Sequence, residues 1–333
     1  MKFKIIVNDS SLWRYNNIFE HYENYESGPI ADLDFIVSLG DFIPSNTNCQ
    51  IIENNYYIRK DYFYCKGDSY KFTKWSFEIF GLDKSSSLIK ISSNASGYLW
   101  MCGFIIEFML HYKLALKGYS IIHASGICDG NKGMIFSARG GGGKTTLALH
   151  SLENNFKLLG DNYIILHKGK ILNYLTPLNI FYYNLAPIIK NNLTWKDILD
   201  LKLRSFLYKI TNNYIKIFKK ININTICPEL VTNNVSASIL ILLIQGNNFN
   251  VKILNKICFC RHILYNQKLE TLLFIPYIEA YSYVFPNSPL AKYWSFYLEN
   301  LIHNLPDDAK FLLVTLPKQH LSKNIDKIME LTK

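Results

Sequence analysis

Residues 134–150 read Met-Ile-Phe-Ser-Ala-Arg-Gly-Gly-Gly-Gly-Lys-Thr-Thr-Leu-Ala-Leu-His, the clearest structural signal in the chain. Apolar residues typical of a strand run into four consecutive glycines, and Lys144 then opens a segment with good helix propensity. Strand, glycine loop and helix in this order are typical of a P-loop, whose backbone N–H groups form a concave nest for phosphate oxygens. A flexible glycine linker is the alternative, but its flanks would not normally be a buried strand and a helix. The stretch therefore predicts a phosphate-binding loop.

Each position of this loop has an expected role. Lys144 is expected to reach the β- and γ-phosphates, and the Thr145 hydroxyl is expected to ligate Mg²⁺. Ala138 stands where the motif G-x-x-x-x-G-K-[ST] has its first glycine, and it must adopt a negative φ there or accept some strain. Arg139 lies within the loop, where it could contact phosphate or could equally be an exposed surface arginine. The positions expected to contact the nucleotide are Arg139, Gly140, Gly141, Gly142, Gly143, Lys144, Thr145 and Thr146.

Two residues outside the loop are candidates for chemistry. His123 lies in the apolar segment before the loop, and Asp161 follows an apolar segment after it. A carboxylate at the carboxyl end of a strand lies where α/β sheets place ligands, and it can hold Mg²⁺ or accept a proton. Taken alone, His123 could be a hydrogen-bonded core histidine and Asp161 a turn residue. Their register with the loop favours catalysis, so the candidate catalytic residues are Asp161, His123 and Lys144.

Three blocks together resemble the HPr kinase/phosphorylase-related family of P-loop kinases, relatives of ATP-dependent phosphoenolpyruvate carboxykinase. The blocks match the family's His block, Walker A loop and Asp block in order and spacing, and they occupy residues 122–126, 137–146 and 158–163. The resemblance implies an α/β fold with a P-loop core of the HPr kinase/carboxykinase type and a β-rich N-terminal region. It also implies ATP and Mg²⁺ as cofactors, with His123 and Asp161 facing the γ-phosphate and a carboxylate acting as general base toward a seryl hydroxyl.

The Asp block departs from the family at its second position. The bifunctional members carry paired acids there, whereas this chain has Asn162, which can coordinate or orient but cannot accept a proton. If the second acid is the base, the chain is impaired; if one acid suffices, Asp161 acts alone or shares the task with His123. The candidate metal ligands are thus Thr145, Asp161 and Asn162. The family's second signature is not found, so no phosphorolysis is expected.

The sequence therefore predicts an ATP- and Mg²⁺-dependent kinase whose acceptor is a hydroxyl, in particular a serine or threonine of a protein or peptide. The resemblance also suggests a gene cluster for modified peptides or surface polysaccharides. One alternative is a nucleotide-binding adaptor or regulator with little or no phosphotransfer, which Asn162 and Ala138 favour. A small-molecule kinase is a second alternative, left open by the carboxykinase kinship. Retention of His123 and Asp161 favours the enzyme.

The chain's 333 residues, with 49% hydrophobic and 15% aromatic content, are ample for two domains and far from a disordered composition. We expect a β-rich N-terminal region at 1–95, a connecting helix at 96–118 and a P-loop kinase-like domain at 119–333. Ser96 is the expected N-cap of the helix, and Gly118 lies just past its end.

Composition also limits the partners. The net charge of +10 comes from lysine alongside abundant Asn, Ile and Tyr, and no nucleic-acid motif accompanies it, so no nucleic-acid partner is expected. The most hydrophobic helix candidate, 97–116, carries Glu107, His111 and Lys113, so no membrane span is expected. Seven scattered cysteines and the lack of a signal peptide predict a soluble, cytoplasmic protein. A homo-oligomer is compatible with these features.

The rest of the predicted P-loop domain has strand and helix signals. Strands are expected at 119–124, 132–137, 156–160, 163–167 and 170–174, and a hairpin is expected to join 237–244 to 251–254. Cys258, Cys260 and His262 would share a face of any strand, a weak zinc signal. Thr194 opens a helical region with apolar residues at helical spacing and many lysines. A solvated face, or a dock for an acidic or phosphorylated substrate, would explain this pattern.

Overall fold

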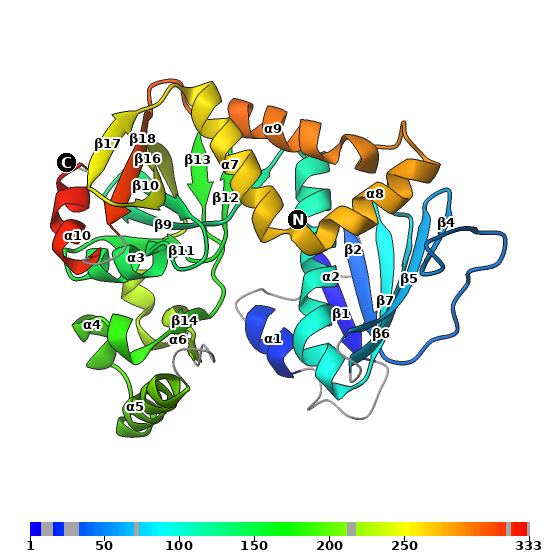
Figure 1. Cartoon of the computed structure of the whole chain (residues 1–333), viewed down its shortest axis with the longest axis horizontal. Coiled ribbons are helices and arrows are strands. Elements are labelled where there is room, and N and C mark those ends of the chain that lie inside the picture. The colour runs from blue at the N-terminus through cyan, green and yellow to red at the C-terminus, as the bar shows by residue number, and fades with distance from the viewer. Residues whose placement is uncertain (8–15, 23–32, 70–72, 212–217, 318–320, 332–333) are drawn as a thin grey trace. The chain divides into compact units, whose positions relative to one another are not determined.

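The computed structural model describes the chain except residues 8–15, 23–32, 70–72, 212–217, 318–320 and 332–333. The chain is mixed α/β and contains two large mixed sheets (Figure 1). Contacts divide it into two compact units: unit 1 is Met1–Gly118 with Thr271–Tyr297, and unit 2 is Tyr119–Glu270 with Leu298–Lys333. This division differs from the expected domains in Thr271–Tyr297, which the sequence analysis placed with the P-loop domain.

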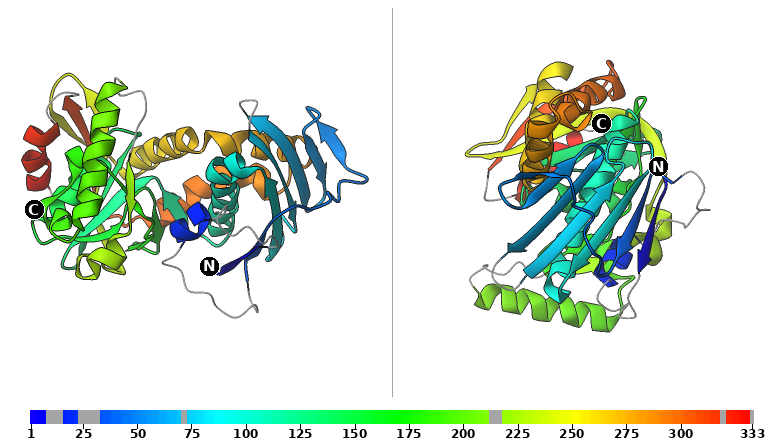
Figure 2. Two further views of the ribbon diagram at one scale, coloured as in Figure 1. Left: turned by 90° about the horizontal axis from the view of Figure 1, so that it is seen from below. Right: turned by 90° about the vertical axis from the view of Figure 1, so that its right-hand side faces the viewer.

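Unit 1 is built on a seven-stranded sheet, whose strands lie side by side in the right-hand view of Figure 2. The strands on one side of it, β1 (Phe3–Val7), β2 (Phe35–Leu39) and β7 (Ser87–Ser93), are parallel. The order then continues through antiparallel neighbours: β6 (Thr73–Phe80), β5 (Tyr62–Ser69), β4 (Tyr56–Arg59) and β3 (Gln50–Ile52). Helix α1 spans Asn16–Tyr22.

Helices α2 (Ala95–Leu116) and α8 (Ile275–Val284) pack with this sheet. Helix α2 begins after Asn94, whose side chain accepts a hydrogen bond from the Gly97 N–H at 3.1 Å, so the expected N-cap at Ser96 was wrong. Asparagine caps a helix as well as serine does. Gly118 has a φ of 79° just past the helix end, as expected of a C-terminal glycine. On α8, the Tyr277 ring meets the Phe77 ring edge-on at 5.2 Å, which explains why this segment joins unit 1.

Unit 2 is built on a nine-stranded sheet around one long strand, β16 (Asn234–Gly246). On one side of β16 lie β10 (Lys132–Ala138), β9 (Ala124–Asp129) and β11 (Lys157–Gly160). On its other side lie β13 (Lys170–Leu172), β12 (Ile164–His167) and β8 (Ser120–Ile122), with β18 (Lys310–Pro317) and β17 (Asn250–Ile253) beside its second half. A separate pair of strands joins β14 (Leu178–Ile180) to β15 (Lys219–Ile221).

Some helices of unit 2 pack against this sheet, and others belong to the segment between β14 and β16. Helix α3 (Lys144–Leu152) follows β10 and packs on β9, β10 and β11. Helices α7 (Lys256–Glu270) and α10 (Leu321–Glu330) contact the β16 and β18 side. Helix α9 (Tyr293–Asn304) begins in unit 1 and belongs to unit 2 from Leu298 onward. The segment between β14 and β16 carries α4 (Pro187–Lys190), α5 (Trp195–Ile210) and α6 (Ile223–Ile226).

The structure corrects three of the expected elements. The strand expected at 119–124 is two strands, because the chain changes partner at His123 and β9 then forms a hairpin with β10 about Gly130, whose φ is 54°. The expected hairpin of 237–244 with 251–254 was wrong. β18 pairs with both β16 and β17 and lies between them, because its apolar run Phe-Leu-Leu-Val fits the buried position. Cys258, Cys260 and His262 lie on helix α7, so they do not share a strand face.

Within the residues the structure describes, no helix is long and apolar enough to cross a membrane.

The packing around β10 makes a stability prediction. A Cβ at Gly133 would lie 2.7 Å from the Ser236 carbonyl oxygen and 2.6 Å from the Ile171 side chain. Gly133→Ala should therefore lower the free energy of unfolding by about 1–3 kcal/mol, because the strands must separate. Gly103→Ala is the control: a Cβ there meets nothing within 4 Å, and alanine favours its helix. Urea denaturation, monitored by circular dichroism, measures the free energy of unfolding of both variants. Equal effects of the two substitutions would contradict the close packing described around Gly133.

Candidate functional site

The candidate site lies in unit 2, where β10 ends in the glycine loop and α3 begins. Gly141 and Gly143 have φ values of 78° and 91°, which glycine adopts without a Cβ penalty. A Cβ at Gly142 would lie 2.6 Å from the Ala138 Cβ, whereas a Cβ at Gly140 would meet nothing within 4 Å. Ala138 is buried at the end of β10 and is not among the residues with positive φ. The loop thus needs glycine at three positions, and alanine fits the first motif position without strain.

Lys144 is the buried cation at the base of this loop. Its side chain is 7% exposed, and its Nζ donates a hydrogen bond to the Ala138 carbonyl oxygen at 2.8 Å. Burial lowers the pKa of Lys144 to about 8, although the charges of Asp161 and Glu270 partly offset this effect. A positive charge held at the end of a glycine loop favours a bound polyanion such as a triphosphate.

Asp161 lies directly after β11 and is 5% exposed. Its Oδ2 accepts a hydrogen bond from Thr145 Oγ1 at 2.8 Å, and its Oδ1 accepts one from the Ser125 hydroxyl. The carboxylate therefore connects the end of β11 with β9 and with the first turn of α3. A hydroxyl and a carboxylate are oxygen donors of the kind Mg²⁺ takes, and this ion fills its remaining positions with waters and substrate phosphates. Ser125 was not predicted, although it lies in the His block of the sequence.

His123 and Arg139 meet at a carboxylate that the sequence analysis missed. His123 Nδ1 lies 3.0 Å from Glu270 Oε2, and Arg139 Nη1 donates to Glu270 Oε1 at 2.9 Å. The Arg139 side chain is 53% exposed, whereas that of His123 is 11% exposed. Glu270 lies at the end of α7, far from the loop in sequence and without a motif around it. No local signal could have found it.

The electrostatics of this cluster have clear directions. Burial lowers the pKa of His123, and although Glu270 opposes this, His123 is held neutral at pH 7. Burial acts to raise the pKa of Glu270, but His123, Arg139 and Lys144 outweigh it and keep the pKa of this carboxyl below its usual value. The cluster therefore presents an ionised glutamate beside a neutral imidazole.

For two of the predicted site residues, Asn162 and Thr146, the structure gives less support for a role in the site. Asn162 has a φ of 74°, a left-handed conformation that asparagine and aspartate tolerate, and its carbonyl oxygen accepts from the Ala124 N–H at 3.1 Å. This backbone role explains Asn162 without a metal. Thr146 is half-buried in the first turn of α3. Within the described ranges, no group of three or more His, Cys, Asp or Glu side chains could hold a metal ion, so a metal here would depend on Thr145 and Asp161.

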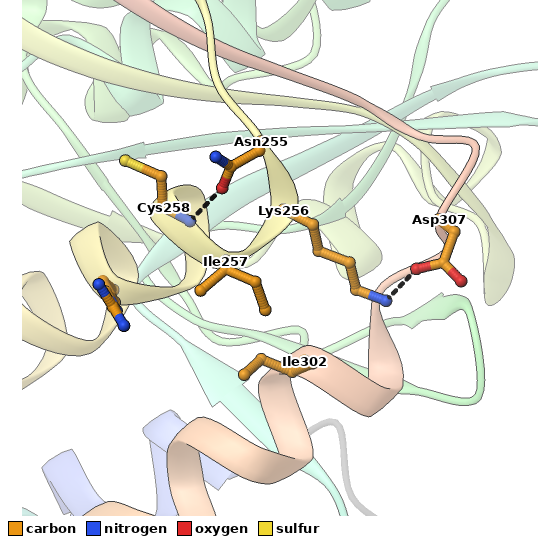
Figure 3. A pocket seen from close by; sticks show the side chains of 7 residues that line it. Asn255, Lys256, Ile257, Cys258, Ile302 and Asp307 are labelled. Carbon is orange, nitrogen blue, oxygen red and sulfur yellow. Dashed lines mark hydrogen bonds and ion pairs between the residues drawn. The ribbon is translucent and has the colours of Figure 1, made fainter.

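A separate hollow in unit 2, of about 500 Å³, lies at the start of α7 (Figure 3). Lys256 Nζ pairs there with Asp307 Oδ1 at 2.7 Å, and Asn255 Oδ1 accepts from the Cys258 N–H at 2.8 Å. The hollow shares no residue with the glycine loop or the Asp161 cluster. Cys260 is buried on α7, so it cannot join Cys258 as a metal ligand at this surface.

Comparisons with known proteins give a structural similarity at low sequence identity. No protein-family model matches it, and no curated protein matches it. Among solved structures it is similar to the Hpr(Ser) kinase/phosphatase from Coxiella burnetii, with a TM-score of 0.29 and 10% sequence identity, over 64% of this chain and 95% of that chain. Similarity at this level settles neither family nor activity, so the function is inferred from the site residues themselves.

We expect the buried charge of Lys144 to lower the free energy of unfolding at pH 7. Because its folded pKa of about 8 lies below the ordinary 10.5, the charged lysine costs stability at pH 7, and this cost disappears as the pH rises from 8 to 10.5. Lys144→Met should therefore raise the free energy of unfolding by about 1–2 kcal/mol at pH 7 and by less at pH 10. Urea unfolding at both pH values measures this.

Lys170→Met, at an exposed lysine of the same unit, is the matched control and should show no such pH dependence. A Lys144→Met variant that is destabilised equally at both pH values would contradict the electrostatic description of the site.

Proposed function

We propose that the chain has a P-loop core of the HPr kinase/carboxykinase type, binds ATP with Mg²⁺ at the glycine loop, and transfers the γ-phosphoryl group to a hydroxyl. The preferred acceptor is a serine or threonine of a protein or peptide. The observation that carries the proposal is the 2.8 Å hydrogen bond between Thr145 and Asp161, directly beside the loop at whose base Lys144 is buried. In P-loop nucleotide sites a threonine and a strand-end aspartate together hold Mg²⁺.

In this proposal each group has a separate task. The N–H groups of the loop and the Lys144 ammonium bind the β- and γ-phosphates, where they stabilise charge that develops during transfer. Thr145 and Asp161 hold the Mg²⁺ ion, which neutralises phosphate charge when bound. Arg139, exposed and reaching Glu270, is placed at the rim of the loop, where it can meet the phosphates.

The acceptor hydroxyl must lose its proton as its oxygen attacks the γ-phosphorus and the bond to the bridging oxygen breaks. Both oxygens of Asp161 already accept hydrogen bonds, whereas His123 is neutral. We assign proton acceptance to His123 Nε2, with Glu270 orienting the ring through Nδ1. This arrangement does not need a second acid at Asn162.

A nucleotide-binding adaptor is the second candidate, favoured by two observations. Asn162 provides no carboxylate, and its left-handed backbone accounts for its presence. Glu270 is held by both His123 and Arg139, so the only other acid of the cluster is already paired. An adaptor would use these contacts to report nucleotide occupancy without transfer.

Phosphotransfer distinguishes the two functions. The protein is incubated with Mg²⁺, γ-labelled ATP and the products of its neighbouring genes. We expect label on a serine or threonine of one product and a loss of at least about 100-fold in rate for Lys144→Ala and Asp161→Asn. His123→Gln should lower the rate about 100-fold or more while ATP binding persists, because it removes only the base. Tight, Lys144-dependent ATP binding with no transferred or released phosphate would instead support the adaptor.

The glycine loop offers a matched pair of variants. Gly142→Ala should weaken ATP binding at least about tenfold, because its Cβ would collide with Ala138 and distort the nest. Gly140→Ala, two residues away with open space at its Cβ, should change the affinity by no more than about twofold. Isothermal titration calorimetry measures both affinities. Equal affinities for the two variants would show that ATP does not bind at this loop.

A further inference from the structure

Helix α5 carries a continuous stripe of exposed apolar side chains. It is the long green helix at the bottom of the right-hand view of Figure 2. The exposed fractions of these apolar side chains range from 41% to 70%, which is high for large hydrophobic residues on a folded domain. We call this set the apolar stripe: Trp195, Leu199, Leu203, Phe206, Leu207 and Ile210.

The apolar stripe faces away from unit 2. Leu201 is the buried residue of α5, with 1% exposure. At about 100° per residue, the six stripe residues fall within about 120° of the helix circumference, and the centre of this arc lies opposite Leu201. Most of the apolar residues at helical spacing in this region of the sequence therefore lie on the exposed face of the helix. The neighbouring turn η2 (Tyr182–Asn184) adds Tyr183, which is 69% exposed.

Positive charge borders the apolar stripe. Lys202 borders it in the helix projection and Lys209 lies beyond Lys202 on the same side, whereas Lys196 falls inside the arc, close to Leu207. The helix's two acids, Asp197 and Asp200, are neutralised: Lys219 lies 2.8 Å and 3.1 Å from them, and Arg204 lies 2.9 Å from Asp200. Within the part of the chain the structure describes, Lys202 and Lys209 form no ion pair. The free charge around the stripe is thus positive, like the net charge of the chain.

We propose that α5 binds the surface of an anionic lipid bilayer, with the apolar stripe inserted among the acyl chains and the bordering lysines at the headgroups. Trp, Phe and Leu on one face with lysines beside them are typical of interfacial helices, which lie in the membrane plane. Lysine stems can bury their methylenes while the ammonium reaches anionic phosphates. Within the described residues Lys202 and Lys209 have no acidic partner, and the arc is wider than the two-position seam of a coiled coil, so a lipid surface is favoured over a second helix. This inference does not depend on the proposed kinase activity.

Sedimentation with vesicles tests the inference. The full chain is mixed with vesicles of phosphatidylcholine alone or with about one third phosphatidylglycerol. We expect binding to the anionic vesicles that weakens with added salt. Leu203→Ser/Phe206→Ser should lower the partition coefficient at least about tenfold, and Lys202→Glu/Lys209→Glu should remove the preference for anionic lipid. These positions are exposed, so thermal denaturation should show that both variants remain folded.

Ile253→Ser is the matched control, because Ile253 is 80% exposed in the same unit but lies on β17, and it should not alter binding. No sedimentation with either vesicle, or equal binding by the stripe variant and the original chain, would overturn the proposal. So would light scattering that shows a stripe-dependent dimer without vesicle binding, since the stripe would then bind a second copy. Stripe-dependent binding of an acceptor protein alone would likewise assign this face to a protein partner.

Discussion

The candidate site depends on how one buried carboxylate is satisfied. Asp161 is 5% exposed and accepts hydroxyl hydrogen bonds at both oxygens, from Ser125 and Thr145. A buried carboxylate without such partners would be costly, so the end of β11, strand β9 and the start of α3 are held in register around it. The same contacts bring the Thr145 hydroxyl to a strand-end carboxylate, the pair of groups that we propose holds Mg²⁺.

Local sequence signals predicted the elements that are determined locally. The strand before the glycine loop, the helix from Lys144 to Leu152 and the capping box of α5 at Thr194 all follow from neighbouring residues, and the structure has each of them. Glu270 could not be predicted, because only the packing of α7 brings it within 3.0 Å of His123. The place of β18 between β16 and β17 is also nonlocal, since it depends on which apolar strand the sheet accepts in its interior.

Two features of unit 2 work against the stability of its fold. The Lys144 ammonium is buried, and burial lowers its pKa because a charge kept out of water costs free energy. The apolar stripe of α5 leaves large hydrophobic side chains in solvent where burial would stabilise the chain. Such departures from a stable fold are expected at functional sites. We propose that Lys144 binds phosphate and that the apolar stripe binds lipid.

The Mg²⁺ dependence of ATP affinity in the Thr145→Val variant is the sharpest test of the proposed metal site. Valine has nearly the shape of threonine and removes the hydroxyl that donates to Asp161 and that is proposed to bind the metal. Titration calorimetry with and without Mg²⁺ should show that Mg²⁺ strengthens ATP binding at least about tenfold in the original chain. It should also show that Thr145→Val loses this gain while its Mg²⁺-free affinity is unchanged. An undiminished Mg²⁺ effect in Thr145→Val would contradict the assignment of the metal to Thr145 and Asp161.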